Sequence, residues 1–148
     1  MSQAGNGFEL HPQLAKDCFV VGDLALDRVL LMNDANYPWL VLVPRRTDLR
    51  ELYELGEADL ALFWRESAEV GRRIMARFGG GKLNVAALGN QVAQLHVHHV
   101  VRHVGDAAWP RPIWGVVPGK PYGSEEAATA IEGLRQLLAD TGLVVATD

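Results

Sequence analysis

The chain has 148 residues, 49% of them hydrophobic and 22% charged, and its formal net charge at pH 7 is −4. These values are ordinary for one soluble globular domain, residues 1–148, and the negative charge argues against a general nucleic-acid-binding protein. The single cysteine, Cys18, excludes a disulfide framework within one chain and is consistent with a reducing compartment. Residues 1–16 lack the features of a secretory signal and no apolar run could span a bilayer, so we expect a cytoplasmic protein without a membrane partner.

Three strands are expected in the first third of the chain. Residues 1–7 suggest a loose tail, and residues 11–15 suggest one helical turn. Runs of β-branched and other apolar residues indicate the strands, at 18–23, 24–32 and 39–43. A turn at 33–38 separates the last two strands, because Asn, Asp and Pro each favour turns, and Pro44 ends the third strand.

Two helices are expected further along the chain. The longer covers residues 57–78, where apolar side chains recur at helical spacing, acidic residues occupy the first turn, and three glycines follow at 79–81. The second begins near Ser124, a favourable N-cap, runs to about Asp140 and ends at Gly142. A short helical piece is expected at 49–55, and a loose tail at the end of the chain.

The region between the helices favours strands. A strand at 82–88 should connect through a tight Gly89–Asn90 turn to a strand around residues 94–103, which makes an antiparallel hairpin. The segment 109–115, Trp-Pro-Arg-Pro-Ile-Trp-Gly, contains prolines that exclude regular helix and central strand. The order of strands, helix, strands and helix predicts the α+β class with an antiparallel sheet.

Four of the five histidines lie within residues 94–103, Gln-Leu-His-Val-His-His-Val-Val-Arg-His. The valines favour a strand, whose side chains alternate between two faces. One face would carry Gln94, His96, His98, Val100 and Arg102, and the other Leu95, Val97, His99, Val101 and His103. We therefore expect His96 and His98 to stand side by side in a polar row suited to phosphate, whereas His99 and His103 are expected to be structural.

This row suits more than one role. A neutral imidazole can attack phosphorus and form a phosphohistidine if nearby donors stabilise the phosphate oxygens and the leaving group. The candidates for that set are His96, His98, Gln94, Gln91 and Asn90. Alternatively, His-x-His presents two metal ligands, and a third would have to come from elsewhere, such as Cys18 or His11. A third interpretation is that the histidines only stabilise the fold.

Several segments together resemble the histidine-triad (HIT) family. Residues 94–100 are similar to its His-apolar-His-apolar-His strand, with Gln94 in place of the first histidine. Residues 39–46 resemble its strand that ends in apolar-Pro-basic, and Asn33-Asp34, Asn84 and residues 89–91 resemble its polar positions. The resemblance covers roughly residues 17–104, and residues 106–115 are similar to a bacterial branch in which Gln begins the triad.

The resemblance implies an α+β fold of about five antiparallel strands with one long helix, followed in residues 105–142 by a Trp/Pro segment and a C-terminal helix. It implies nucleotidyl transfer or hydrolysis through a nucleotidyl-histidine at His96, for example on dinucleoside polyphosphates or nucleoside phosphoramidates. His98 would contact the phosphate or the leaving group, and Gln94 would hydrogen-bond at the first position. The implied substrate-binding residues are Asp34 (for the ribose), Asn84, Asn90 and Gln91, together with Arg102 of the polar row.

The resemblance implies a homodimer and no protein-bound metal or cofactor, although Mg²⁺ can accompany a substrate polyphosphate. A nucleotide-binding regulatory module without useful turnover is the alternative function. Three features depart from the family pattern. Gln94 removes a histidine, and Val101-Arg102 lacks the proline often found before that arginine. His99 replaces an apolar residue, which suggests a side chain facing solvent or a partner. Trp109 and Trp114 are expected either to staple the C-terminal segment to the core or to cover a neighbouring site.

Overall fold

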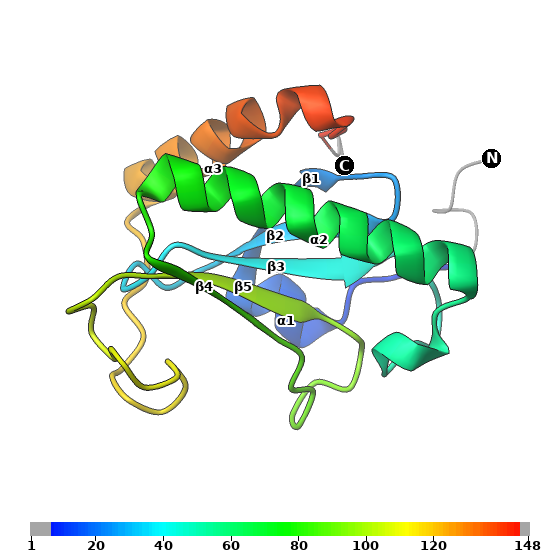
Figure 1. Cartoon of the computed structure of the whole chain (residues 1–148), viewed down its shortest axis with the longest axis horizontal. Coiled ribbons are helices and arrows are strands. Elements are labelled where there is room, and N and C mark those ends of the chain that lie inside the picture. The colour runs from blue at the N-terminus through cyan, green and yellow to red at the C-terminus, as the bar shows by residue number, and fades with distance from the viewer. Residues whose placement is uncertain (1–6, 146–148) are drawn as a thin grey trace.

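One antiparallel sheet of five strands organises the chain (Figure 1). The structure, a computed structural model, describes residues 7–145. The strands are β1 (Cys18–Asp23), β2 (Asp27–Met32), β3 (Trp39–Pro44), β4 (Lys82–Ala86) and β5 (Val97–Arg102). Their order across the sheet is β1-β2-β3-β5-β4, and every neighbouring pair is antiparallel. The expected α+β class with five strands is confirmed.

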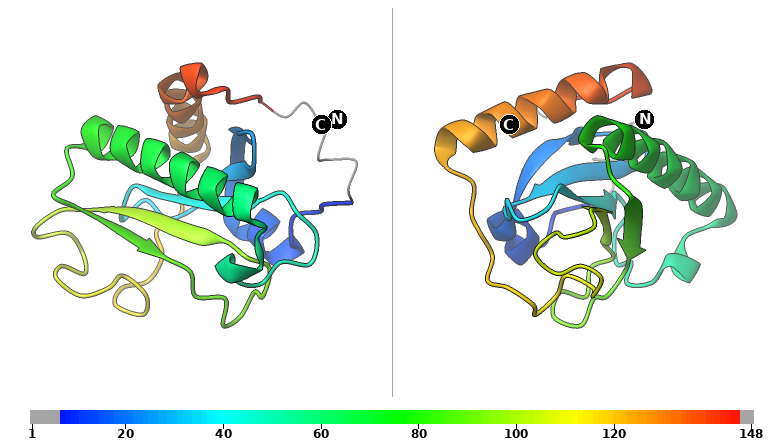
Figure 2. Two further views of the ribbon diagram at one scale, coloured as in Figure 1. Left: turned by 45° about the vertical axis from the view of Figure 1, so that its right-hand side comes forward. Right: turned by 60° about the vertical axis from the view of Figure 1, so that its left-hand side comes forward.

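Each face of the sheet has its own cover (Figure 2). The helices α2 (Glu57–Phe78) and α3 (Ser124–Leu137) lie on one face, over a core that includes Leu40, Val97 and Val101. The other face packs Val41 and Val100 against α1 (Pro12–Asp17) and the irregular segment 103–123. Short 3₁₀ turns occur at Leu52–Glu54 and Ala139–Thr141. Within residues 7–145, none of the helices is long and apolar enough to cross a membrane.

Helix α2 ends at the glycines, as expected, and their small size lets the chain turn tightly. Gly79 has a φ of +63°, the left-handed conformation that closes a helix. A Cβ on Gly80 would lie 2.3 Å from Cγ1 of Val101, which is closer than two carbon atoms can pack. The turn therefore leads directly into β4 and keeps α2 against the histidine strand.

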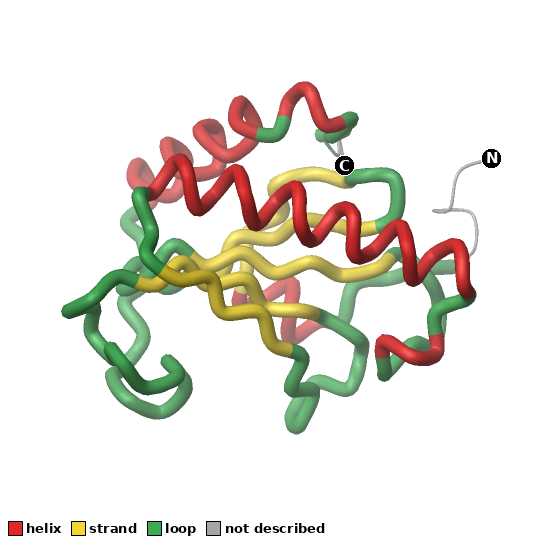
Figure 3. The backbone as a smooth tube through the Cα atoms, in the orientation of Figure 1, coloured by secondary structure: helices red, strands yellow, loops and turns green. Residues whose placement is uncertain are grey.

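Several expected boundaries are wrong. The strand expected at 24–32 begins at Asp27, because residues 24–26 form the turn from β1 to β2, in which the N–H of Leu24 donates to the carbonyl oxygen of Asp27. β4 ends at Ala86, and the connection to β5 runs from residue 87 to residue 96 instead of forming a tight Gly89–Asn90 turn (Figure 3). The described part of the C-terminus is not loose, because Val144 bridges to Asp23. The tails expected at 1–6 and 146–148 lie outside the described residues.

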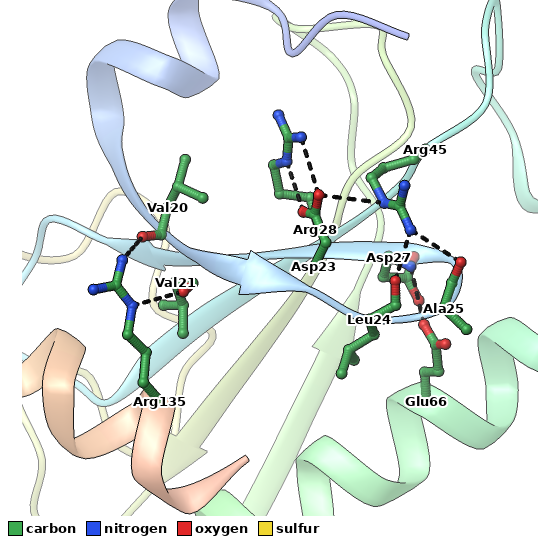
Figure 4. A network of polar contacts seen from close by, with 10 residues as sticks. All are labelled: Val20, Val21, Asp23, Leu24, Ala25, Asp27, Arg28, Arg45, Glu66 and Arg135. Atoms are coloured by element: carbon green, nitrogen blue, oxygen red, sulfur yellow. Dashed lines mark hydrogen bonds and ion pairs between the residues drawn. The ribbon is translucent and has the colours of Figure 1, made fainter. Parts of the chain in front are cut away.

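A buried pair of acids lies under the turn from β1 to β2, on the α2 side of the sheet (Figure 4). Glu66 of α2 accepts hydrogen bonds from the N–H groups of Leu26 and Asp27, each at 3.0 Å. The Asp27 side chain is fully buried. Burial, and then the neighbouring Glu66, raise the pKa of Asp27 well above its usual range, although Arg45 and Arg46 oppose the shift. Folded Asp27 therefore keeps its proton near neutral pH.

We expect the free energy of unfolding to fall as pH rises above about 4, the ordinary pKa of an Asp. Above that value the unfolded residue loses its proton while folded Asp27 keeps it, so folding takes up a proton and higher pH opposes folding. The slope should reach at most about 1.4 kcal/mol per pH unit. Asp27→Asn is always neutral and should flatten the slope, which urea unfolding at several pH values measures. The same slope in both proteins would show that other groups cause it.

Candidate active site

His96 and His98 lie at the beginning of β5, on the face of the sheet away from α2. β5 begins at Val97, so His96 immediately precedes the strand, and the expected strand start near residue 94 is wrong. Within β5 the side chains alternate as expected, because Val97 and Val101 join the core under the helices while Val100 joins the opposite core. The rings of His96 and His98 are neighbours, with 5.1 Å between their centroids. Both residues are buried, with His96 only 7% exposed and His98 only 5% exposed.

A backbone carbonyl orients the ring of His96. Its Nδ1 lies 2.7 Å from the carbonyl oxygen of Gln94. Because a carbonyl oxygen can only accept a hydrogen bond, Nδ1 must carry the proton and donate it. In the neutral ring the lone pair is therefore on Nε2. This nitrogen is the one available to attack an electrophile.

An indole orients the ring of His98. The Nε1–H of Trp39 donates to Nδ1 of His98 over 3.0 Å. An indole nitrogen can only donate, so Nδ1 is the acceptor and the proton of the neutral ring is on Nε2. Burial, and then the nearby His96 and His99, lower the pKa of His98 to about 4. The ring is therefore neutral near physiological pH and offers Nε2–H as a hydrogen-bond donor.

The two tryptophans of the segment 103–123 serve different purposes. The ring of Trp114 lies 5.2 Å from His98 and 6.0 Å from Trp39, between centroids, and 36% of the residue is exposed. Trp109 instead lies against the guanidinium of Arg102, 5.5 Å from its ring centroid. Each tryptophan therefore takes one of the two expected roles, stapling the segment to the core or covering a neighbouring site. Trp109 fastens the segment to the core, and Trp114 covers His98 at the solvent side.

The side chain of Gln94 is occupied by the N-terminal segment. Its Oε1 accepts a hydrogen bond from the N–H of His11, and its Nε2 donates to the carbonyl oxygen of Glu9, each at 2.9 Å. Both ends of the amide are therefore satisfied by backbone. This corrects the expectation that the Gln94 side chain hydrogen-bonds in the site, because Gln94 reaches His96 through its own carbonyl group instead.

A buried ion pair occupies Arg102. Its Nε and Nη2 donate to the two carboxylate oxygens of Asp106, at 2.8 and 3.0 Å, and its Nη1 donates to Oδ1 of Asn84 at 2.9 Å. Arg102 is only 1% exposed. The guanidinium lowers the pKa of Asp106 well below its usual range. Arg102 and Asn84 were each expected to bind substrate, but here their side chains hold each other and join β5 to β4 and to the turn that follows.

Asp34 also has structural partners. Its Oδ1 accepts hydrogen bonds from the N–H groups of Asn36 at 2.9 Å and Lys120 at 3.3 Å, which closes the turn and holds the end of the segment 103–123. The turn leads into β3 at Trp39, which pairs with Val100, whereas His96 lies at the other end of β5. The structure therefore places Asp34 toward the far end of the histidine strand.

The amides of Asn90 and Gln91 are exposed on the connection that leads to His96. The structure describes no side-chain hydrogen bond that would occupy them within residues 7–145. They lie on the chain segment that ends at the histidine pair, so they are the expected binding residues that stay open to a ligand.

The remaining two histidines of the cluster stabilise the fold. His99 is fully buried, with Nε2 at 2.7 Å from the hydroxyl of Ser67 on α2 and Nδ1 at 3.1 Å from the carbonyl oxygen of Val97. His103 donates from Nε2 to the carbonyl oxygen of Phe78, the last residue of α2. The expectation that His99 faces solvent or a partner is wrong, because its ring is enclosed between the sheet and α2.

Cys18 and His11, the residues considered as a third metal ligand, have contacts of their own away from the histidine pair. The thiol of Cys18 lies 3.9 Å from the sulfur of Met32, and Nδ1 of His11 accepts a hydrogen bond from the N–H of Gln13 at the start of α1. Across residues 7–145, no three side chains of His, Cys, Asp or Glu are grouped so that they could hold a metal ion. The described residues therefore bring no third ligand to His96 and His98.

Trp39 belongs to the site although the sequence pattern around it predicts only a strand. One signal was available. A buried indole needs an acceptor for its N–H, and the run Trp-Leu-Val-Leu-Val-Pro contains no polar side chain. The acceptor had to come from another element, but the run does not show which one.

Comparisons with known proteins agree with this architecture. The family model of the HIT domain matches residues 13–105. A histidine triad protein from Marinobacter aquaeolei VT8 is 47% identical, with a TM-score of 0.88 over 90% of this chain and 98% of that chain. A histidine triad protein from Bradyrhizobium japonicum is 46% identical, with a TM-score of 0.84 over 87% of this chain and 96% of that chain. A comparison with curated proteins finds no match. Since the family model spans more than half of the sequence and the solved relatives share its fold, this chain belongs to the HIT domain family.

Proposed function

We propose that the protein transfers or hydrolyses the nucleotidyl group of nucleotide conjugates through a covalent nucleotidyl-histidine at His96. The observation that carries the proposal is the pair of opposite tautomers: His96 presents a lone pair at Nε2, and the neighbouring His98 presents an N–H. A nucleophile beside a hydrogen-bond donor is what transfer of a phosphoryl group requires. Membership of the HIT family, whose members generally bind or hydrolyse nucleotides, supports a nucleotide as the substrate.

In the proposed reaction, Nε2 of His96 attacks the α-phosphorus while the bond from phosphorus to the leaving group breaks. The carbonyl oxygen of Gln94 accepts from Nδ1–H and stabilises the positive charge that the ring acquires. His98 donates from Nε2 to a phosphate oxygen, and the amides of Asn90 and Gln91 add further donors. Water then attacks phosphorus, the electron pair of the P–N bond returns to Nε2, and the nucleotide is released.

The nucleoside is proposed to extend along β5 toward Asp34, whose carboxylate would accept from the ribose hydroxyls. The reaction needs no protein-bound cofactor, and Mg²⁺ would enter only with a polyphosphate substrate. We propose a cytoplasmic location, which a free, buried thiol at Cys18 supports because such thiols persist in reducing compartments.

We propose that the protein forms a homodimer in which two copies pair along their β4 strands. This strand is at the edge of the sheet, and 41% of its Val85 is exposed. An exposed edge strand with an apolar side chain favours pairing with a second copy. Sedimentation equilibrium should give the mass of two chains, and Val85→Lys should shift the protein toward one chain. A wild-type mass of one chain would contradict the dimer.

The proposed function is tested by incubation with adenosine conjugates of three classes: diadenosine polyphosphates, adenylyl sulfate and adenosine phosphoramidate. Chromatography should detect release of AMP from at least one class. Alkaline quenching during turnover of a substrate labelled in the α-phosphate should leave label on His96, because phosphohistidine survives alkali. Binding of AMP without release from any class would contradict catalysis and favour the regulatory module.

A further inference from the structure

We infer that this site acts on nucleotides whose leaving group departs as a stable anion, such as a phosphate, polyphosphate or sulfate in an anhydride, and discriminates against phosphoramidates. The reason is that the hydrogen bond from Trp39 keeps the imidazole of His98 neutral. A neutral imidazole can donate a hydrogen bond to the substrate, but it cannot give its proton to a leaving group. This inference rests on the proposed function and narrows its substrate class.

The contact between Trp39 and His98 allows only one form of the imidazole. The indole N–H approaches Nδ1 at 3.0 Å, and it has no lone pair with which to accept. A protonated His98 would carry N–H groups on both nitrogens, so that two donors would face each other at this contact. The cationic form would therefore lose the hydrogen bond and bring two positive hydrogens together.

Trp39 cannot easily turn away from this contact. The residue is 8% exposed, and its ring packs edge-on against the rings of Tyr37 at 6.5 Å and Trp114 at 6.0 Å, between centroids. Burial itself also disfavours a charge on His98, whose pKa is lowered to about 4. The N–H of a neutral imidazole can donate a hydrogen bond to a phosphate oxygen, but it is too weak an acid to give up its proton near neutral pH.

Among residues 7–145, no other group is placed to act as the acid. The side chain of Gln94 does not titrate and is held by the backbone of residues 9 and 11. In the described part of the chain, the only hydrogen-bond partners of the rings of His96 and His98 are the Gln94 carbonyl group and the Trp39 indole. The titratable groups that perturb His98 are two further imidazoles, His96 and His99, and not carboxyl groups.

Whether the reaction needs a general acid depends on the chemistry of the leaving group. With an anhydride, the new bond from Nε2 of His96 to phosphorus forms as the P–O bond breaks, and the electron pair leaves on an oxygen of phosphate or sulfate, which needs no proton. With a phosphoramidate the P–N bond breaks, and the nitrogen must gain a proton to leave as an amine. General acid catalysis typically contributes about 10²–10⁴-fold to such a step, and this site does not supply it.

The test compares adenylyl sulfate with adenosine phosphoramidate, which share AMP and differ in a small leaving group. We expect kcat/KM for adenylyl sulfate to exceed that for the phosphoramidate by at least about 100-fold. Trp39→Phe keeps a ring but removes the N–H, so His98 can be protonated and the ratio should fall by about fivefold. Intrinsic reactivity of the two substrates cancels in this comparison of ratios. Tyr37→Phe removes the hydroxyl of the neighbouring buried ring and should leave the ratio unchanged.

Nitrogen NMR of the wild-type imidazoles tests the tautomer without turnover and without a variant. The Nδ1 of His98 should keep the chemical shift of an unprotonated nitrogen between about pH 5 and pH 8. A protonated Nδ1 in that range overturns the inference. Equal cleavage of the two substrates overturns it but leaves the proposed function intact, whereas absence of AMP release from either substrate and from diadenosine polyphosphates overturns both.

Discussion

His96→Ala is expected to lower kcat/KM for AMP release by at least about 10⁴-fold, because removing a nucleophile removes the covalent route altogether. The fold should survive, since the side chain makes one hydrogen bond, to the Gln94 carbonyl oxygen, and such a bond contributes about 1 kcal/mol. Steady-state kinetics on the conjugate that the wild type cleaves fastest measure the loss. Circular dichroism and thermal unfolding show that the variant is folded.

Two further variants separate the roles of the histidines. His98→Ala should reduce kcat/KM by about 10²–10³-fold, less than His96→Ala, because it removes one donor to the transition state and keeps the nucleophile. His103→Ala is the matched control, since His103 follows the opposite end of β5 and bonds to the carbonyl oxygen of Phe78, away from the site. It should retain wild-type kinetics. Full activity in His96→Ala would refute the nucleophile assignment.

Asp106→Ala is expected to destabilise the fold by about 3–5 kcal/mol, the usual consequence of leaving one partner of a buried ion pair alone. The side chain of Arg102 is 98% buried, and Asp106 accepts two of its three hydrogen bonds. Asp106 also accepts from the N–H groups of residues 103, 108 and 109, so the turn after β5 depends on it. Urea unfolding measures the change.

A matched exposed pair gives the control. Asp140→Ala removes one of the two acidic partners of Arg73 at the surface, where 78% of the Asp140 side chain is exposed, and should leave Tm nearly unchanged. The pair at Asp106 also has a defined pH dependence. Its folded pKa is below the unfolded value, so its stabilisation is present above about pH 4 and is lost as pH falls through the folded pKa. Equal Tm values for Asp106→Ala and the wild type would contradict this account of Arg102.

Local patterns predicted the secondary structure where the signal is local. The bounds expected for α2 agree with the structure, because helical spacing, acidic residues at the start and glycines at the end all lie within the element. The strands β1 and β3 begin where the apolar runs begin. By contrast, the dipeptide Gly89-Asn90 occurs in tight turns and in longer loops alike. It therefore does not indicate how many residues connect β4 to β5.

The sequence by itself determined the α+β class, the histidine strand and the adjacency of His96 and His98, because alternation along a strand and spacing along a helix are properties of neighbouring residues. Only the tertiary structure decided what each polar side chain contacts. Gln94 meets backbone 83 and 85 residues away, and Trp39 of β3 meets His98 of β5, 59 residues further along the chain. Such contacts depend on which strands become neighbours in the sheet. They decide that Arg102 belongs to the core, that Gln94 acts through its backbone, and that an indole sets the tautomer of His98.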